Sequence, residues 1–283
     1  MSGAALVAPP TAASSLLGRP AAKIGLVIVV LFLLLCAFAP LVAPYDPYDQ
    51  DLMNALAAPS SAHWLGTDQY GRDVASRVMY GARYALLAVV IGDGLALALG
   101  SVMGLAAGYL GGVVDAVIMR VVDVLLAFPY LLLALIIVAA LGPSLLHSLI
   151  AIGIVYTPQY ARLLRGQVLG VRQTDFVKAA RALGASSTRV IVHHVAPNSL
   201  SPVIVMATLQ AGSVIIETAG LSFLGLGAQP PSPDWGTLLS EGQDYFLSAW
   251  WIATFPGLAI FIVVLGFNLL GDALRRGFDP RAQ

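Results

Sequence analysis

Long stretches without a charged residue are the feature of this chain that most constrains its fold. Residues 124–161 contain no Asp, Glu, Lys or Arg, and similar runs cover 24–45, 190–216 and 245–271. A membrane core about 30 Å thick is crossed by a helix of about 20 apolar residues. The sequence is 58% hydrophobic and 11% charged, whereas soluble domains are about 25% charged. We therefore predict an all-α, polytopic membrane protein.

These runs predict six transmembrane helices. Residues 24–45 form the first span, for which a cleaved signal peptide is the alternative. Residues 83–105 form the second, and their glycines, Gly92, Gly94, Gly100 and Gly104, are typical of close helix contact in lipid. Residues 124–161 are long enough for a helical hairpin that turns at Gly142 and Pro143, and 190–216 and 245–271 complete the set. The chain then divides into a tail at 1–23, a six-span membrane domain at 24–272 with a polar loop at 162–197, and a tail at 273–283.

Basic residues give the orientation, because cytoplasmic loops carry an excess of Lys and Arg. The segments predicted to be cytoplasmic hold Arg19, Lys23, Arg120, Arg162, Arg165, Arg172, Lys178, Arg181, Arg189, Arg275, Arg276 and Arg281, and those predicted to lie outside hold Arg72, Arg77 and Arg83. Both termini are therefore expected in the cytoplasm. The formal net charge of zero gives no case for a nucleic-acid partner. The single cysteine, Cys36, is expected to pack inside the first span.

The polar stretch 175–197 stands between two long apolar runs and is expected to form a short amphipathic helix. Asp175 is predicted to cap its start and Gly184 to end it. One face would carry Phe176, Ala179, Ala180 and Leu183, while Lys178 and Arg181 lie off that face. Two interpretations follow from composition: the helix docks into a groove of a soluble partner, or it lies among lipid headgroups.

Three motifs resemble one family. Lys178, Ala179, Ala180, Gly184 and Pro197 match the spacing of the cytoplasmic "EAA" loop of permease subunits of ABC importers. The loop departs from the general pattern, with Lys178 in place of Glu, His194 in place of an apolar residue and Ala196 in place of Leu. HWLGTDQYGRDVASRVMYGAR at 63–83, ETAGLSFLGLGAQPPSPDW at 217–235 and the FDPR ending resemble the "C-type" subunit of dipeptide, oligopeptide and nickel permeases.

The resemblance implies a type I ABC importer permease in the bacterial cytoplasmic (inner) membrane, with the coupling helix between spans 4 and 5. Its implied partners, besides membrane lipid, are a second permease subunit, two cytoplasmic ABC ATPases and an extracytoplasmic substrate-binding protein. The residues implied in coupling are Asp175, Phe176, Lys178, Ala179, Ala180, Arg181, Leu183, Gly184 and Pro197. Short peptides are the expected cargo, with nickel chelates or another small solute as the alternative. The chain has no P-loop sequence, so ATP and Mg²⁺ are expected on the ATPases and no cofactor on this chain.

Other residues are candidates for the translocation path or the outer mouth. Acids within or near the spans, Asp93, Asp115, Asp123 and Glu217, are costly in lipid and so are functional candidates. Residues 221–227, which include Ser222 and Phe223, precede three prolines and are interpreted as a re-entrant or surface segment. In 63–83, Thr67 or Asp68 is expected to cap a short helix, and Arg72, Asp73 and Arg77 to form local ion pairs. Asp68 or Asp73 contacting cargo is the alternative.

Two other protein classes fit the sequence less well. An ion-coupled secondary transporter more often shows internal repeats or broken helices around paired intramembrane charges, and no repeat is evident in the sequence. An intramembrane enzyme needs a convergent catalytic set, and the sequence offers no metalloprotease or nucleophile-elbow motif. His193 and His194 are interpreted as making a hydrogen bond or a partner contact, not as metal ligands.

Overall fold

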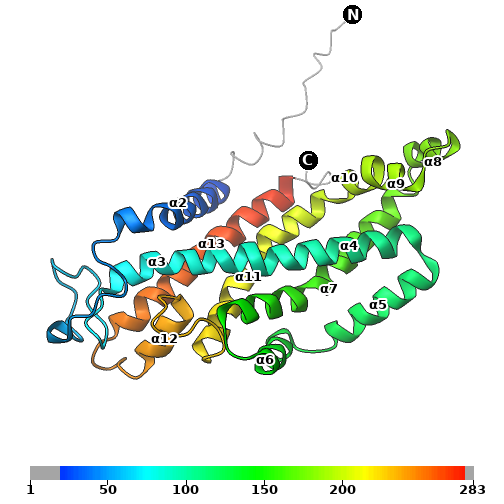
Figure 1. The fold of residues 1–283 in the computed structure, drawn as a ribbon. Coiled ribbons are helices and arrows are strands. Elements are labelled where there is room, and N and C mark those ends of the chain that lie inside the picture. The colour runs from blue at the N-terminus through cyan, green and yellow to red at the C-terminus, as the bar shows by residue number, and fades with distance from the viewer. Residues whose placement is uncertain (1–19, 278–283) are drawn as a thin grey trace, which may run out of the picture.

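The computed structural model describes residues 20–277, and within this range it contains helices and no strands (Figure 1). The long elements are α2 (Pro20–Val42), α3 (Val74–Leu87), the π-helical turn η2 (Ala88–Asp93), α4 (Gly94–Leu110), α5 (Gly112–Leu126), α6 (Tyr130–Leu141), α7 (Leu145–Val171), α11 (Ser201–Phe223) and α13 (Trp251–Gly277). The short ones are η1 (Leu52–Asn54), α8 (Asp175–Ala182), α9 (Ser187–Val190), η3 (Ile191–Val195), α10 (Ala196–Ser199) and α12 (Trp235–Gln243). The predicted all-α class is confirmed for these residues.

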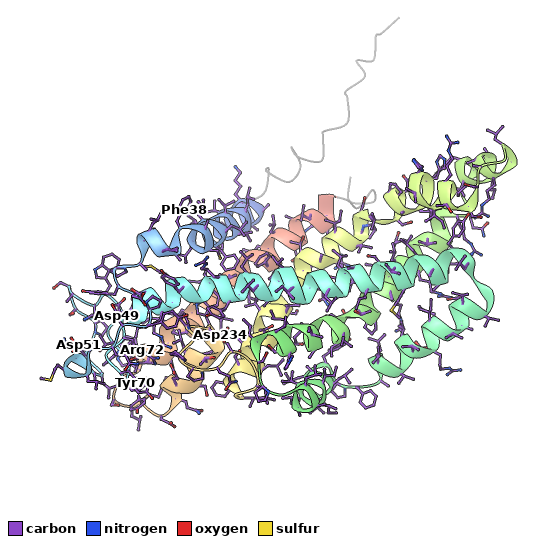
Figure 2. All side chains as sticks on the ribbon, in the orientation of Figure 1. Phe38, Asp49, Asp51, Tyr70, Arg72 and Asp234 are labelled. Atoms are coloured by element: carbon purple, nitrogen blue, oxygen red, sulfur yellow. The ribbon has the colours of Figure 1, made fainter. Side chains whose placement is uncertain are left out.

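The long helices lie side by side along one axis, so the molecule has two distinct ends (Figure 1). At one end, here called the α8 end, are α8 to α10, and the start of α2 and the end of α13 point toward this end. At the other, the α12 end, are α12 and the loop between α2 and α3. Asp49, Asp51, Tyr70 and Arg72 gather at the α12 end, whereas Phe38 lies on the outside of α2 (Figure 2). Residues 1–19 and 278–283, which include Arg19, Arg281 and the FDPR ending, lie outside the described residues.

The apolar helices meet the six-span prediction only in part. Four continuous helices are long and apolar enough to cross a membrane: α2, the run Val74–Leu110, α11 and α13. The pair α5 and α6 makes a fifth if counted as one span, but it is bent by 95°. Although α7 has 27 residues and is long enough to cross, it is less apolar. Since much of α7 is buried by its neighbours, it has less lipid-facing surface to keep apolar.

Two predicted span boundaries are wrong. Gly142 and Pro143 do form the turn before α7, but the sequence before them is divided into α5, which begins at Gly112, and α6, with the break where Pro129 precedes α6. Proline removes a backbone donor and disfavours helix in the residue before it. The predicted fifth span, 190–216, begins where α9 ends and first contains η3 and α10, and the long helix covers Ser201–Phe223 instead. Absence of charge marks apolar sequence, and it does not mark where a helix changes direction.

Close contact between α4 and α7 forms the centre of the molecule. A Cβ added at Gly100 would lie 2.4 Å from Tyr160 Cβ, and one at Gly104 would lie 2.7 Å from the Ala161 carbonyl oxygen. A Cβ added at Gly108, on the same face of α4, would lie 2.8 Å from Val168 Cβ. Small residues let helix backbones approach closely in lipid. The packing role predicted for the glycines is thus confirmed at Gly100 and Gly104, while Gly92 makes ordinary contacts and Gly94 faces open space.

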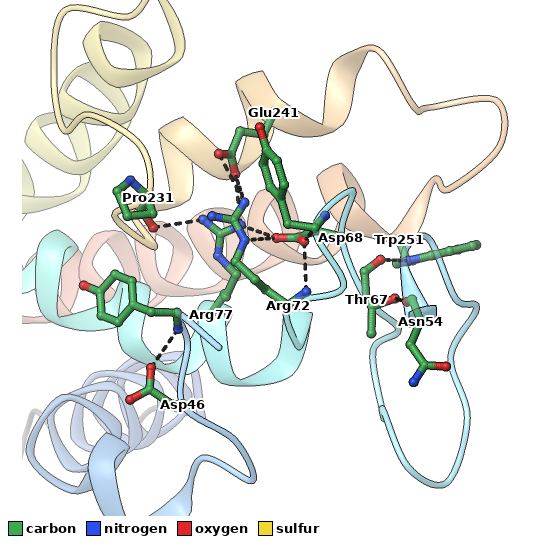
Figure 3. Close-up of polar contacts among 11 residues, drawn as sticks. Asp46, Asn54, Thr67, Asp68, Arg72, Arg77, Pro231, Glu241 and Trp251 are labelled. Atoms are coloured by element: carbon green, nitrogen blue, oxygen red, sulfur yellow. Dashed lines mark hydrogen bonds and ion pairs between the residues drawn. The ribbon is translucent and has the colours of Figure 1, made fainter. Parts of the chain in front are cut away.

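A buried ion cluster of Asp68, Arg72, Arg77 and Glu241 closes the α12 end (Figure 3). The Asp68 carboxylate accepts from Arg72 Nε at 2.6 Å and from Arg77 Nη1. Glu241 on α12 accepts from Arg72 Nη2 at 3.1 Å and from Arg77 Nη1 at 3.0 Å, and Arg77 Nη2 donates to the Pro231 carbonyl oxygen at 3.2 Å. The cluster therefore joins the α2–α3 loop to α12 and to the segment before it.

This arrangement corrects the prediction for residues 63–83. Asp73, and neither Thr67 nor Asp68, caps α3, because Ser76 N donates to Asp73 Oδ2 at 2.7 Å. The ion pairs of Arg72 and Arg77 reach Glu241, far along the chain, and so are not only local. Asp73 instead lies 3.0 Å from the Nδ1 atom of His63. Asp68 therefore pairs with Arg72, and Asp73 pairs with His63 and caps α3. These are the structural roles expected in preference to contact with cargo.

We predict that Asp68→Asn destabilises the protein by about 3 kcal/mol, because breaking a buried ion pair leaves uncompensated charge. The measurement is the thermal unfolding midpoint of the purified protein in detergent. The matched control is Asp272→Asn on α13, whose ion pair with Arg276 is long, at 3.9 Å, and exposed, so that its loss costs less than about 1 kcal/mol. Equal shifts for both variants would contradict the structural role of the cluster.

We also predict that Gly104→Ala lowers the same midpoint, whereas Gly94→Ala leaves it unchanged or raises it. The first methyl would meet the backbone of α7, and overpacking of this kind costs about 1–3 kcal/mol. The second would enter open space, and alanine favours helix over glycine. If both variants unfold alike, the α4–α7 contact is not as close as described.

Candidate functional site

At the α8 end, α8 is a two-turn helix that follows α7 after three residues. Thr174 is its N-cap residue and Asp175 is its first helical residue, so the helix begins one residue earlier than predicted. An acid in the first turn still stabilises the helix because the amino end carries partial positive charge. Lys178 Nζ lies 3.7 Å from Asp175 on the exposed surface.

Gly184 ends α8, as predicted. Its φ of +83° lies in the left-handed region, which glycine adopts without steric cost. The Gly184 amide donates to the Arg181 carbonyl oxygen at 3.0 Å, and the Ala185 amide donates to that of Ala180 at 3.1 Å. These two bonds form a Schellman motif, which satisfies the last carbonyl groups of a helix. The chain therefore turns sharply after two turns of helix.

The apolar residues of α8 occupy two faces, which corrects the single face predicted. Val177 is fully buried, in the same apolar core cluster as Val190 and Val195. Ala180 packs against that cluster and so faces inward, although it was predicted to share the exposed face. Phe176, Ala179 and Leu183 remain exposed, Phe176 at 47% and Leu183 at 88%. We call these three residues the α8 face.

Contacts with the long helices hold α8 in place. Arg172, which follows α7, donates from Nη1 to the Gly108 carbonyl oxygen at 2.8 Å, near the end of α4. The Arg181 guanidinium lies 5.1 Å from the centre of the Tyr109 ring, a favourable cation–π distance. The position of α8 therefore depends on the α4–α7 pair, and neither arginine was predicted to make these contacts.

The segment after α8 places His194 beside Phe176 of the α8 face. The rings of His194 and Phe176 have centres 6.4 Å apart. His193 Nδ1 lies 3.3 Å from the Arg189 carbonyl oxygen, and Asn198 donates to the His194 carbonyl oxygen at 2.7 Å. Pro197 is exposed in α10. In the described part of the chain, no three His, Cys, Asp or Glu side chains gather as a metal site.

Two of the predicted acids are hydrogen-bonded to tyrosines of α7. Asp93, at the end of η2, accepts from the Tyr160 hydroxyl at 2.6 Å. Glu217, on α11, accepts at Oε1 from the Tyr156 hydroxyl at 2.8 Å, while its buried Oε2 has no partner among the described residues. One turn of α7 thus faces both acids. We call Asp93, Tyr156, Tyr160 and Glu217 the acid–tyrosine pairs.

A hydrogen bond between two uncharged side chains also joins α11 to α7 near the acid–tyrosine pairs. Gln210 on α11 donates to Gln159 on α7 at 2.8 Å. The sequence analysis missed Tyr156, Gln159 and Tyr160. The signal available was a group of polar side chains inside the uncharged run 124–161.

The other two acids join α5 to α7 instead of facing the acid–tyrosine pairs. Arg165 holds Asp115 through two hydrogen bonds, of 2.5 and 2.6 Å. Arg162 holds Asp123 at 2.5 Å, with both side chains more than half exposed. Asp115 and Asp123 therefore have structural partners, and Arg120 is not one of them in the described residues.

The segment after α11 packs back onto that helix. Residues 221–223 belong to α11 itself, so the non-helical segment starts three residues later than predicted. Ser222 is buried and accepts from the Ala228 amide at 3.3 Å, whereas Phe223 is exposed. Asp234 caps α12 and is buried, which raises the pKa of its carboxyl. The last predicted path residue, Asp68, lies apart in the ion cluster, where it is fully buried.

Comparison with known proteins places these features in a family. Residues 100–283 match the family described as "Binding-protein-dependent transport system inner membrane component", and residues 11–59 match the "N-terminal TM domain of oligopeptide transport permease C". A solved structure, of inward-facing conformations of the MetNI methionine ABC transporter, shares the fold with a TM-score of 0.57 at 16% identity. The match covers 72% of this chain and 97% of that chain.

Curated relatives match along most of their length. The dipeptide transport system permease protein DppC of Escherichia coli (strain K12) is 52% identical over 92% of this chain and 89% of its own. DppC of Alkalihalophilus pseudofirmus is 48% identical over 92% and 86%, and the glutathione transport system permease protein GsiD of Shigella flexneri is 47% identical over 89% and 84%. This chain therefore belongs to the inner-membrane permeases of binding-protein-dependent transport systems, in their dipeptide and oligopeptide branch.

Proposed function

We propose that this chain is one of two permease subunits that form the translocation path of an ATP-driven importer of short peptides. The observation that carries the proposal is the 44–52% identity, over about nine-tenths of the chain, to permeases named for dipeptide or di/tripeptide transport. The second permease subunit, two ATPases that bind ATP and Mg²⁺, and a substrate-binding protein are the proposed partners.

In this proposal the chain crosses the bacterial inner membrane six times, with α5–α6 and α7 as the third and fourth spans. The α8 end lies in the cytoplasm. Support comes from seven of the basic residues in the described part of the chain, which lie toward that end: Lys23, Arg172, Lys178, Arg181, Arg189, Arg275 and Arg276. Arg72 and Arg77 lie at the α12 end, which would receive the binding protein.

The α8 face is the proposed contact with an ATPase. Its surface consists of the aromatic Phe176, the small Ala179 and the branched Leu183. On the opposite side of the same short helix, Val177 is buried in the protein core. A few side chains that become buried between two partners carry most of the binding energy of an interface, and the exposed Phe176 and Leu183 are the candidates here. A lipid-surface helix is less well supported, because Val177 and Ala180 face the protein core. Closure of the ATPases would move α8, and with it the α4–α7 pair, as a rigid body.

The acid–tyrosine pairs are the proposed polar part of the translocation path. Ionisable groups at membrane depth usually mark substrate or ion pathways. Glu217 is favoured over Asp93 because one of its oxygens lacks a partner in the described residues, so it can take a donor such as the ammonium group of a peptide. Asp93 then sets the position of α7 through Tyr160.

We predict that Leu183→Arg abolishes coupling. The Leu183 side chain is 88% exposed, so the variant loses little internal packing and should still enter the membrane. Charge at an apolar anchor costs about 2 kcal/mol or more of docking energy, and uptake should fall at least about tenfold. The measurement is ATP-driven uptake of a labelled dipeptide by proteoliposomes containing the whole importer, together with the amount of ATPase that co-purifies.

The matched control is Thr188→Arg, which adds the same charge to an exposed position at the same end but off the α8 face. It should transport normally. Normal uptake by Leu183→Arg, or an equal loss in both variants, would contradict docking through the α8 face.

We predict that Glu217→Gln lowers dipeptide uptake about tenfold, equivalent to about 1.4 kcal/mol, because the amide keeps the shape but lacks the charge. ATPase co-purification should be unchanged, which separates this defect from that of Leu183→Arg. Asp272→Asn, at an exposed acid of α13, should transport normally. Unimpaired uptake by Glu217→Gln would remove Glu217 from the path.

A further inference from the structure

A groove of about 690 Å³ lies between α2 and the run from α3 to η2. Its walls are mostly apolar, and Leu33 and Leu87 are exposed in them. Arg83, Tyr48, Tyr80 and Tyr84 also line it. The groove belongs neither to the α8 face nor to the acid–tyrosine pairs.

Arg83 is the unusual member of this groove. Its side chain is exposed, it lies within a candidate membrane span, and it forms no ion pair within residues 20–277. An unpaired arginine facing lipid is costly unless it reaches the interface or finds an anion. Arg72 and Arg77, in contrast, are buried and share Asp68 and Glu241.

The depth of Arg83 allows its guanidinium to reach lipid headgroups. Its neighbour Ala82 accepts a hydrogen bond from Cys36 Sγ at 3.2 Å, and Cys36 is six residues before Val42, where α2 ends. Six residues of helix rise about 9 Å, a distance that a long arginine side chain can largely cover by snorkelling. Tyr48, Tyr80 and Tyr84 resemble the aromatic belt found at membrane interfaces.

The polar groups of the groove are rich in donors. Arg83 contributes only N–H donors, and each tyrosine contributes a hydroxyl. The hydroxyls of Tyr48 and Tyr84 are 3.5 Å apart, at the limit of a hydrogen bond, and that of Tyr80 has no partner in the described residues. A phosphodiester has acceptors and negative charge, and it pairs well with a guanidinium.

We propose that this groove binds a membrane phospholipid of the leaflet at the α12 end, with its phosphate on Arg83 and the tyrosine hydroxyls. Acyl chains occupy the apolar walls, which a free phosphate would leave unfilled. Charge complementarity selects the occupant: the groove presents one unpaired cation and no acid among its lining residues. The inference requires only that the chain lies in a membrane, so it does not rest on the proposed function.

The test is native mass spectrometry of the delipidated full chain, titrated with phosphatidylglycerol and with diacylglycerol carrying the same acyl chains. The wild type should bind phosphatidylglycerol more tightly than diacylglycerol, which lacks the phosphate. Arg83→Gln should weaken phosphatidylglycerol binding about fivefold, as expected for one cation near a lipid phosphate. It should leave diacylglycerol binding unchanged, and Arg83→Lys should retain part of the preference.

Arg120→Gln is the matched control, because Arg120 is also exposed and forms no ion pair in the described residues but lies on α5. Its effect on phosphatidylglycerol binding should be small. Equal binding by Arg83→Gln and the wild type, or equal loss in both arginine variants, would overturn the site. A Leu87→Cys variant that cross-links in membranes to a second permease subunit would overturn the proposal, because the groove would then be covered by protein instead of lipid.

Discussion

The close approach of α4 and α7 is the contact on which the rest of the molecule depends. Gly100, Gly104 and Gly108 recur every four residues, which places them on one face of α4, and each would clash with α7 if it carried a Cβ. Lipid supplies no hydrophobic force between helices, so van der Waals packing and interhelical hydrogen bonds must hold them. With two backbones at this distance, a displacement of one helix displaces the other, and the pair behaves as a single rigid unit.

That rigid unit connects the two candidate sites. The α7 helix carries the tyrosines that bind Asp93 and Glu217, and after three residues it leads into α8. The α4 helix follows η2, which holds Asp93, and near its other end it accepts a bond from Arg172. The α8 helix is therefore joined to the acid–tyrosine pairs through α7 directly and through α4 by the Arg172 contact. In the proposed importer, this route couples ATPase closure to the path.

Sequence alone predicted the features that depend on local chemistry. Gly184 ends α8 because its left-handed φ suits glycine, and the apolar runs mark helices because lipid cannot satisfy an open backbone. Features that depend on distant residues were not predictable. The Glu241 partner of Arg72 and Arg77, the tyrosines facing Asp93 and Glu217, and the burial of Val177 arise only when remote segments meet. The bend at Pro129 lies between these cases, since proline signals a break but not its angle.

The two ends differ in how they hold their charges, and this difference fits their proposed roles. At the α12 end, Asp68, Arg72, Arg77 and Glu241 pair in a buried network, where losing any partner leaves a costly charge. At the α8 end, the Lys178–Asp175 pair is exposed, and such pairs cost little to rearrange. A helix that must move between partners needs weak polar contacts around a well-anchored apolar core. Val177 behind α8, with Leu183 free in front, provides that combination.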